Sequence, residues 1–156
     1  MDNVTGNQTW ARVEVDMAFR EASQLTAASP ARVWQVWSDV NHWPDWNPDM
    51  KASHLDGPLK LGATGTIDTR SGGKHDVVVT YFEDGRSFEL ESTALPGTKM
   101  AIRATIAPSG VGSRIIQGFE PRGLLAPLVG PMMSGPILKT FNSVLAGLKQ
   151  KVEAGS

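Results

Sequence analysis

The feature that most constrains this chain is a tryptophan-rich segment, residues 29–49. It contains four of the five tryptophans of the 156-residue protein: Trp34, Trp37, Trp43 and Trp46. Ser29 is a favoured helix N-cap, and Pro30 suits the first helical turn, where no backbone N–H is needed. A buried aromatic side chain removes about 150–250 Å² from water. The segment is therefore expected to anchor one layer of a small domain.

The first half of this tryptophan segment has the spacing of a short helix. Val33, Val36 and Trp37 recur at helical intervals and form one apolar face. Pro44 and Pro48 follow, and each proline favours extended geometry in the residue before it. The segment therefore predicts a short helix, a break, and a second helical turn or two.

The same residues resemble the N-terminal signature of the polyketide cyclase/dehydrase-like branch of the START-related (SRPBCC) superfamily. The matching positions are Ser29-Pro30, Val33-Trp34, Asp39 and Trp43-Pro44-Asp45-Trp46. A looser likeness continues through residues 61–65 to the C-terminal helix and covers roughly residues 18–153. The resemblance implies the helix-grip fold, which birch-pollen-type allergens also have. In this α+β fold, a curved antiparallel sheet of six to seven strands wraps around a long C-terminal helix, and two short helices follow the first strand.

Length and composition predict one globular domain in residues 17–156, preceded by a flexible tail, residues 1–16. The apolar fraction of 40% and the charged fraction of 20% are typical of soluble globular proteins. The net charge of −1 gives no basis for a nucleic-acid partner. The sequence shows neither a signal-peptide core nor an apolar run long enough to cross a membrane. A cytoplasmic protein without integral membrane association is expected, and its oligomeric state is left open.

Alternating and β-branched stretches separated by turn residues predict seven strands. They are residues 19–27, 50–55, 64–70, 75–82, 87–92, 98–107 and 113–120. A run of strands followed by one long helix at the end of the chain indicates an α+β fold.

One hairpin allows the facing of its side chains to be predicted. Asp84-Gly85 is a favoured two-residue turn, which pairs Tyr81 with Phe88. Alternation then gives one inward-facing set: His75, Val77, Val79, Tyr81, Phe88 and Leu90. The intervening Glu89 and Glu91 are expected to face water.

The C-terminal helix is predicted to start near Ser134-Gly135-Pro136. Its apolar stripe contains Leu138, Phe141, Leu145, Leu148 and Val152, widened by Ile137 and Val144. The apolar residues 124–133 before it contain two prolines, so a broken helix or a flap is expected at the mouth of a cavity. The resemblance implies that this cavity, between sheet and helix, is the binding site. Its other predicted lining residues are Met100, Ile102, Met132 and Met133.

The sequence offers few residues for catalysis. Its three histidines lack paired ligand spacing, it has no cysteine, and no cofactor motif is present, so neither metal nor cofactor is expected. His75 and Tyr81 are the candidate acid–base or ligand-orienting groups. Asp68 and Gln117 are further candidates whose facing the pattern does not determine. Arg103 is expected on the outer face.

Three functions follow from these observations. The first is binding, with or without transport, of a small to medium hydrophobic ligand, lipid-like or polycyclic. The second is a cofactor-free polyketide cyclase or dehydratase that uses His75 or Tyr81. Cyclase relatives carry an arginine on the strand corresponding to residues 75–82, and this sequence has none there. The third is a protein-interaction module, which an exposed apolar patch would favour.

Overall fold

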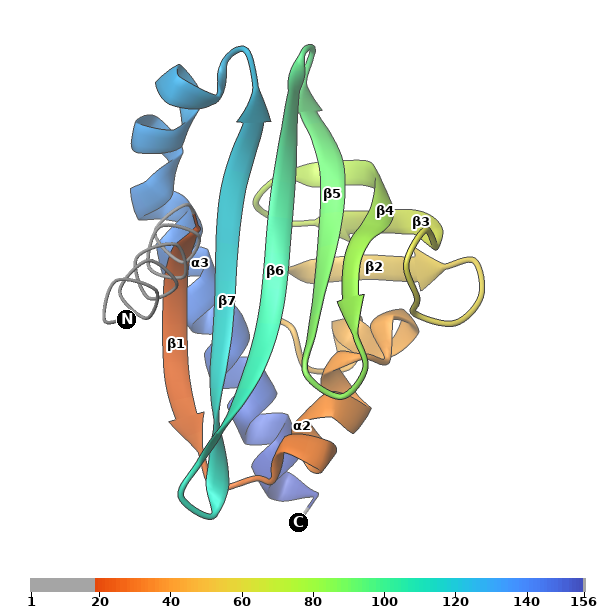
Figure 1. Ribbon diagram of the computed structural model, residues 1–156, viewed down its shortest axis with the longest axis vertical. Coiled ribbons are helices and arrows are strands. Elements are labelled where there is room, and N and C mark those ends of the chain that lie inside the picture. Colours follow the sequence, from red (N-terminus) through yellow and green to blue (C-terminus); the bar gives the residue numbers. More distant parts are fainter. Residues whose placement is uncertain (1–18, 156) are drawn as a thin grey trace, which may run out of the picture.

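A computed structural model describes residues 19–155, which form a curved antiparallel sheet and three helices (Figure 1). The strands are β1 (Arg20–Thr26), β2 (Met50–Leu55), β3 (Thr64–Thr69), β4 (Gly73–Glu83), β5 (Ser87–Leu95), β6 (Thr98–Ser109) and β7 (Gly112–Gly123). Their order in the sheet is β1-β7-β6-β5-β4-β3-β2. The long helix α3 (Ala126–Ala154) passes behind β7 in Figure 1 and defines the inner face of the sheet. The predicted helix-grip fold is thus confirmed, while the predicted tail, residues 1–16, lies outside the described residues.

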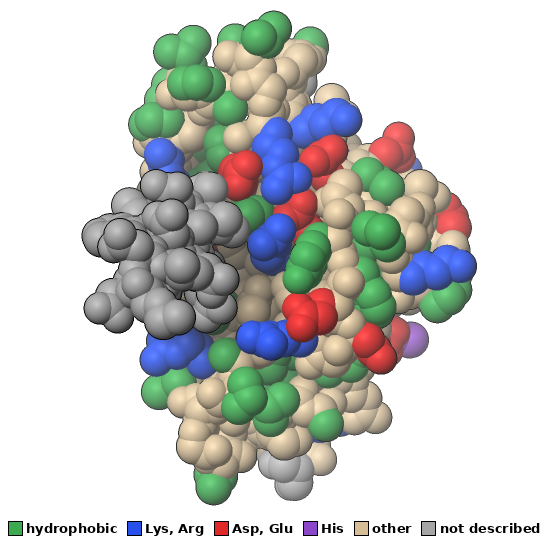
Figure 2. Space-filling model, in the orientation of Figure 1, with side chains coloured by type: hydrophobic (Ala, Val, Ile, Leu, Met, Phe, Trp, Pro, Cys, Tyr) green, Lys and Arg blue, Asp and Glu red, His purple; other side chains and the backbone are tan. Residues whose placement is uncertain are grey.

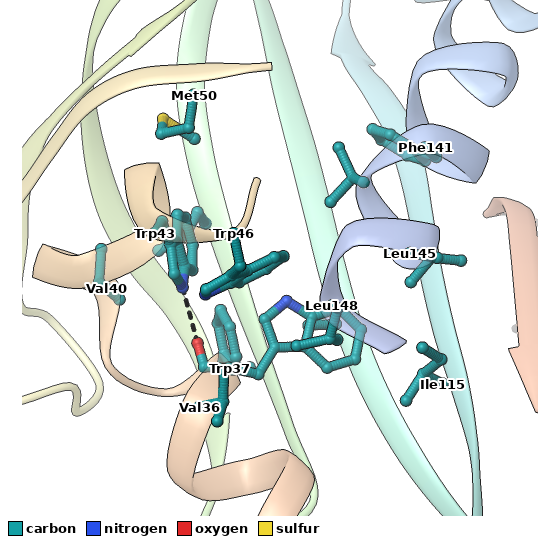
Figure 3. Packing of buried hydrophobic residues seen from close by; sticks show 14 of the residues in the cluster. Val36, Trp37, Val40, Trp43, Trp46, Met50, Ile115, Phe141, Leu145 and Leu148 are labelled. Carbon is teal, nitrogen blue, oxygen red and sulfur yellow. Dashed lines mark hydrogen bonds between the residues drawn. The ribbon is translucent and has the colours of Figure 1, made fainter. Parts of the chain in front are cut away.

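The tryptophan segment folds as its sequence predicts. Helix α2 (Pro30–Trp37) begins with Pro30, and the Ser29 side chain accepts a hydrogen bond from the Arg32 N–H at 3.2 Å. The short 3-10 helix η1 (Val40–Asp45) follows after two residues. The Trp43 indole N–H then donates to the Trp37 carbonyl oxygen at 2.8 Å (Figure 3). This bond joins the two helices through an otherwise apolar cluster.

Phe88 of β5 is the point where the tryptophan segment meets the sheet. The rings of Trp34, Trp37 and Trp43 surround it, with centroid distances of 6.0, 6.3 and 6.1 Å. Trp34 and Trp37 meet Phe88 edge to face and Trp43 stacks with it, and both are favourable arrangements of aromatic rings. The tryptophans thus pack against β5, whereas α3 contacts β1 and β7.

Helix α3 starts at Ala126, earlier than predicted. The break was predicted from Pro127 and Pro131, but Pro127 lies in the first turn of the helix. The helix continues through Pro131 and Pro136, although each removes a backbone N–H donor. The guanidinium of Arg20 on β1 donates a hydrogen bond to the Gly130 carbonyl oxygen, so this proline-containing part is held against the sheet edge. The prediction of a broken helix or flap over residues 124–133 was wrong for the part after Leu125.

The predicted apolar stripe of α3 is confirmed. Phe141, Val144, Leu145, Leu148 and Val152 are buried, and Ile137 and Leu138 are partly buried against the same core. Gly147 lies on this helix directly beside the Trp46 carbonyl oxygen, and a Cβ there would overlap that oxygen. Glycine therefore allows α3 to approach the tryptophan segment closely.

The β4–β5 hairpin differs from its prediction near the turn. Phe82 pairs with Phe88 and Tyr81 with Glu89, one residue away from the predicted register. A β-bulge between Val79 and Tyr81 then restores the predicted pairing, with Val79 opposite Leu90.

Candidate functional site

The inner face of the sheet, the tryptophan segment and α3 enclose a cavity with two chambers. The outer chamber has a volume of about 330 Å³ and reaches the first half of α3 and the β3–β4 turn. The inner chamber, about 80 Å³, lies against Trp37, Trp43 and Trp46. Both chambers share Ile102 and Phe141 in their walls, so they adjoin each other.

Most of the residues predicted to bind a ligand line this cavity. Those in the outer chamber are His75, Met100, Met132 and Met133; those in the inner chamber are Val77, Phe88 and Leu90; Ile102 and Phe141 belong to both. Val79 is buried in the core and lines neither chamber, and Leu138 packs against the core without lining either chamber.

The predicted inward facing of Tyr81 was wrong. The bulge places both Thr80 and Tyr81 on the outer face of the sheet, where the Tyr81 ring lies 4.6 Å from the Arg103 guanidinium. Its hydroxyl donates to the Glu83 carboxylate at 3.1 Å, and this hydrogen bond raises the pKa of Tyr81. The phenol is therefore no part of the cavity.

His75 and Asp49 are the titratable side chains that line the cavity in the described part of the chain. The His75 Nε2 lies 2.6 Å from the Gly72 carbonyl oxygen, to which it donates a hydrogen bond. The Asp49 carboxylate accepts bonds from the backbone N–H and hydroxyl of Ser71, at 2.9 and 2.7 Å. Both groups thus have local partners at the mouth, and the Asp49–Ser71 pair joins the tryptophan segment to the β3–β4 turn.

The structure also settles the facing of two further candidates. Gln117 of β7 lines the inner chamber and is buried. Asp68 points to the opposite face, because its neighbours Ile67 and Thr69 both line the cavity.

Five polar side chains in the cavity wall were not identified as site residues from the sequence. Asn47 lies in the inner chamber, Ser71 in the outer one, and Thr69, Ser92 and Thr140 line both. Ser92 continues the alternation of Phe88 and Leu90, which was a usable signal. For Asn47 and Thr140, in contrast, the three-dimensional contacts reveal that they face a cavity. The site is therefore mainly apolar, with a few polar groups at separate points.

On the outer face, charged residues of β5, β6 and β7 form a compact ion network, visible at the centre of Figure 2. Glu89 is at its centre and is only 2% exposed, which contradicts the prediction that this residue faces water. It binds Arg103 and Arg122, each at 2.8 Å, and Thr80 donates to it at 2.8 Å. Burial raises the pKa of Glu89, but the bonds from Arg122 and Thr80 and the two positive charges outweigh burial and lower it. The prediction that Arg103 lies on the outer face is confirmed.

No cluster of metal-ligating side chains occurs among residues 19–155, and no helix within that range is long and apolar enough to span a bilayer. No lysine or arginine lines either chamber in the same range. Among these residues, the only full charge in the wall is that of Asp49.

Comparisons with known proteins agree with this architecture. The family model described as polyketide cyclase / dehydrase and lipid transport matches residues 17–153. Comparison with curated proteins gives no match.

Among solved structures, a START superfamily protein from Mycobacterium smegmatis is similar, with a TM-score of 0.72 and 20% identity; the match covers 88% of this chain and 99% of that one. A protein from Thermus thermophilus has a TM-score of 0.69 and 15% sequence identity, and the match covers 88% of this chain and 99% of that one. Norcoclaurine synthase from Thalictrum flavum, solved with dopamine and hydroxybenzaldehyde, has a TM-score of 0.66 and 15% sequence identity. The match covers 88% of this chain and 87% of that one. At these identities the structural matches establish the fold.

Proposed function

Because the chain belongs to the polyketide cyclase/dehydrase and lipid transport family, we propose that it binds a small to medium hydrophobic molecule, polycyclic or lipid-like, in the cavity behind the sheet. The observation that carries this proposal is the pair of adjoining, mainly apolar chambers, one lined by the methionines and the other by the tryptophans. Small-molecule sites are typically concave and mainly apolar, with few polar groups. The thioethers of Met132 and Met133 adapt readily to ligands of different shape.

Binding is favoured over catalysis by the positions of the titratable groups. Tyr81 lies outside the cavity, and the His75 Nε2–H and the Asp49 carboxylate are engaged by neighbouring groups at the mouth. A general acid or base must reach the reacting atoms directly or through one water. A ligand in the inner chamber would meet only neutral side chains there, apart from Asp49 at its edge.

The alternative of a protein-interaction module has one feature in its favour. Leu124 just before α3, and Leu128 and Met132 in its first turns, are 91%, 68% and 80% exposed. Of the three, Met132 also lines the outer chamber, so at least this part of the exposed patch belongs to the ligand site.

The test is native mass spectrometry of freshly purified protein, followed by denaturing extraction of any bound molecule. A hydrophobic compound at near-stoichiometric level is expected. Thr140→Phe, which places a ring at the junction of the chambers, should remove most of it, whereas Ala146→Phe on the exposed side of the same helix should not. An empty wild-type protein whose melting temperature no hydrophobic compound raises would refute the proposal.

A further inference from the structure

Gln117 has a side-chain amide that faces the inner chamber and has no hydrogen-bond partner among residues 19–155. Its backbone is paired on both sides, with Ala22 of β1 and Ala104 of β6, and its side chain is 9% exposed in the wall of the inner chamber. Within the described range, the side-chain amide makes no hydrogen bond. Its atoms are not among the fully buried unpaired atoms of that range, so the amide opens onto the chamber. An amide in this position can form hydrogen bonds with a ligand atom in the chamber.

A second amide faces the same chamber. The Asn47 Oδ1 accepts a hydrogen bond from the Asp49 N–H at 2.9 Å, while its NH₂ group has no acceptor within residues 19–155. Side-chain NH₂ groups are donors, and the amide of Gln117 can both donate and accept. The inner chamber therefore offers donors to an oxygen atom of a ligand.

The charges of the wall indicate that this oxygen is uncharged. No lysine or arginine within residues 19–155 lines the cavity, and the one full charge that this range contributes, on Asp49, is negative. A carboxylate or phosphate would lose its hydration without gaining a cationic partner, and Asp49 would repel it.

The position of Gln117 indicates which end of a ligand carries the oxygen. Across the sheet, Gln117 shares a row with Ala104 and Phe88, next to the tryptophans. Ser92 and Met100 pair in a row four residues further along β5, which corresponds to about 13 Å of strand. Met100 lines the outer chamber, so an elongated ligand would extend from the amides towards the methionines.

We propose that the inner chamber selects neutral ligands with a ketone or hydroxyl oxygen at the end that enters first, and that Gln117 is the residue that determines this selectivity. This inference rests on the proposed function and adds the chemical class of the ligand. Anionic lipids and free fatty acids are excluded by the same wall.

Three fluorescent probes with one polycyclic body test the inference: 1-butylpyrene, 1-pyrenebutanol and 1-pyrenebutyrate. At pH 7.5 the alcohol is expected to bind about tenfold more tightly than the hydrocarbon, the effect of one hydrogen bond. The carboxylate is expected to bind at least about tenfold more weakly than the alcohol, because it remains ionised and unpaired.

Gln117→Leu should abolish the preference for the alcohol over 1-butylpyrene and leave 1-butylpyrene affinity nearly unchanged. Gln150→Leu, on the exposed side of α3, is the matched control and should keep the preference. Thermal melting checks folding; the ligand-free Gln117→Leu protein should melt at or above the wild-type temperature, because an unpaired amide has been removed. Gln117→Met serves as a second variant of similar length.

The outcomes separate the two proposals. If none of the probes binds the wild-type protein, the proposed function fails. If all three bind equally, or the carboxylate binds most tightly, the cavity binds ligands but the inference of a neutral oxygen is wrong. A preference for the alcohol that survives in folded Gln117→Leu or Gln117→Met would show that Gln117 does not determine it.

Discussion

The carboxylate of Glu89 accepts two hydrogen bonds from the guanidinium of Arg103, at 3.0 and 2.8 Å, on the side of the sheet that faces away from the cavity. The ring of Phe19 lies 4.5 Å from the same guanidinium, and Arg122 closes the network at 2.8 Å from the other carboxylate oxygen. Glu89 is thus a buried anion in a fully paired site. Breaking such a site is costly even where its net contribution to stability is modest.

Glu89→Gln is expected to lower the free energy of unfolding at pH 7 by about 2–3 kcal/mol, because the amide keeps the shape but loses the charge that both arginines bind. Because the pKa of Glu89 is lowered in the folded protein, the stabilisation by Glu89 depends on pH. The contribution is complete above the pKa of unfolded glutamate and is lost as the pH falls through the lower, folded value. Urea titrations should show the difference shrinking below about pH 4.

Glu120→Gln is the control, since Glu120 binds Arg122 at 3.2 Å at the more exposed edge of the network. Its loss should cost less than about 1 kcal/mol, as for other partly exposed ion pairs. Equal losses in the two variants would contradict the central role of Glu89.

Gly147→Ala should destabilise the protein by about 1–3 kcal/mol, although alanine is the better helix former. The added Cβ would overlap the Trp46 carbonyl oxygen, so α3 or the tryptophan segment must move. Gly135→Ala in the same helix meets no atom within 4 Å and should stabilise by about 0.5–1 kcal/mol. Thermal and chemical unfolding of the two variants would reveal effects of opposite sign; stabilisation by both would mean that the helix does not pack this closely.

Trp37→Ala should lower the free energy of unfolding by about 3–5 kcal/mol, because this indole at the end of α2 is fully buried against Phe88 and its removal leaves a cavity. Trp37→Phe, which keeps an aromatic ring, should cost distinctly less. Denaturant titration measures both, and a loss below about 1 kcal/mol for the alanine variant would show that Trp37 is not a core residue.

His42 is expected to titrate above the ordinary histidine pKa, because the Asp39 carboxylate binds its Nδ1 at 2.9 Å and so favours the protonated ring. Asp39→Asn should lower the pKa of His42. An NMR titration of the imidazole signals in both proteins measures the change directly. Any stabilisation from this pair is present at low pH and disappears as the pH rises through the folded pKa.

The elements could be predicted from sequence where the signals are local. The N-cap at Ser29, the proline at the first turn of α2, and the strand from Met50 to Leu55 depend on residues next to one another, and all three are confirmed. The stripe on α3 was equally clear from its period.

The facing of β4 shows how two irregularities can compensate. The loop after Glu83 is one residue longer than a two-residue turn, and the bulge before Tyr81 removes the offset. The inner positions of Val77, Val79 and Leu90 were therefore predicted correctly, and only Tyr81 was misplaced. A bulge depends on contacts made by both faces of a sheet, which a single strand does not reveal.

Long-range partners explain the remaining differences. Glu89 alternates with apolar residues as an exposed side chain would, and only the arginines from β6 and β7 make its burial tolerable. Likewise, α3 continues through two prolines where Arg20, far away in the sequence, binds the Gly130 carbonyl oxygen. The lining by Asn47 and Thr140 depends in the same way on elements brought together by folding.

The arrangement of the two chambers would fix the orientation of a bound ligand. Because Ile102 and Phe141 line both chambers, a ligand bound as proposed would extend past these two side chains, with one end in each chamber. Its end in the outer chamber would stay beside Met132, near the solvent. That end would be accessible to a modifying enzyme or a receiving protein, while the rest of the ligand remained enclosed. The protein would therefore restrict any reaction of its bound ligand to one end of the molecule.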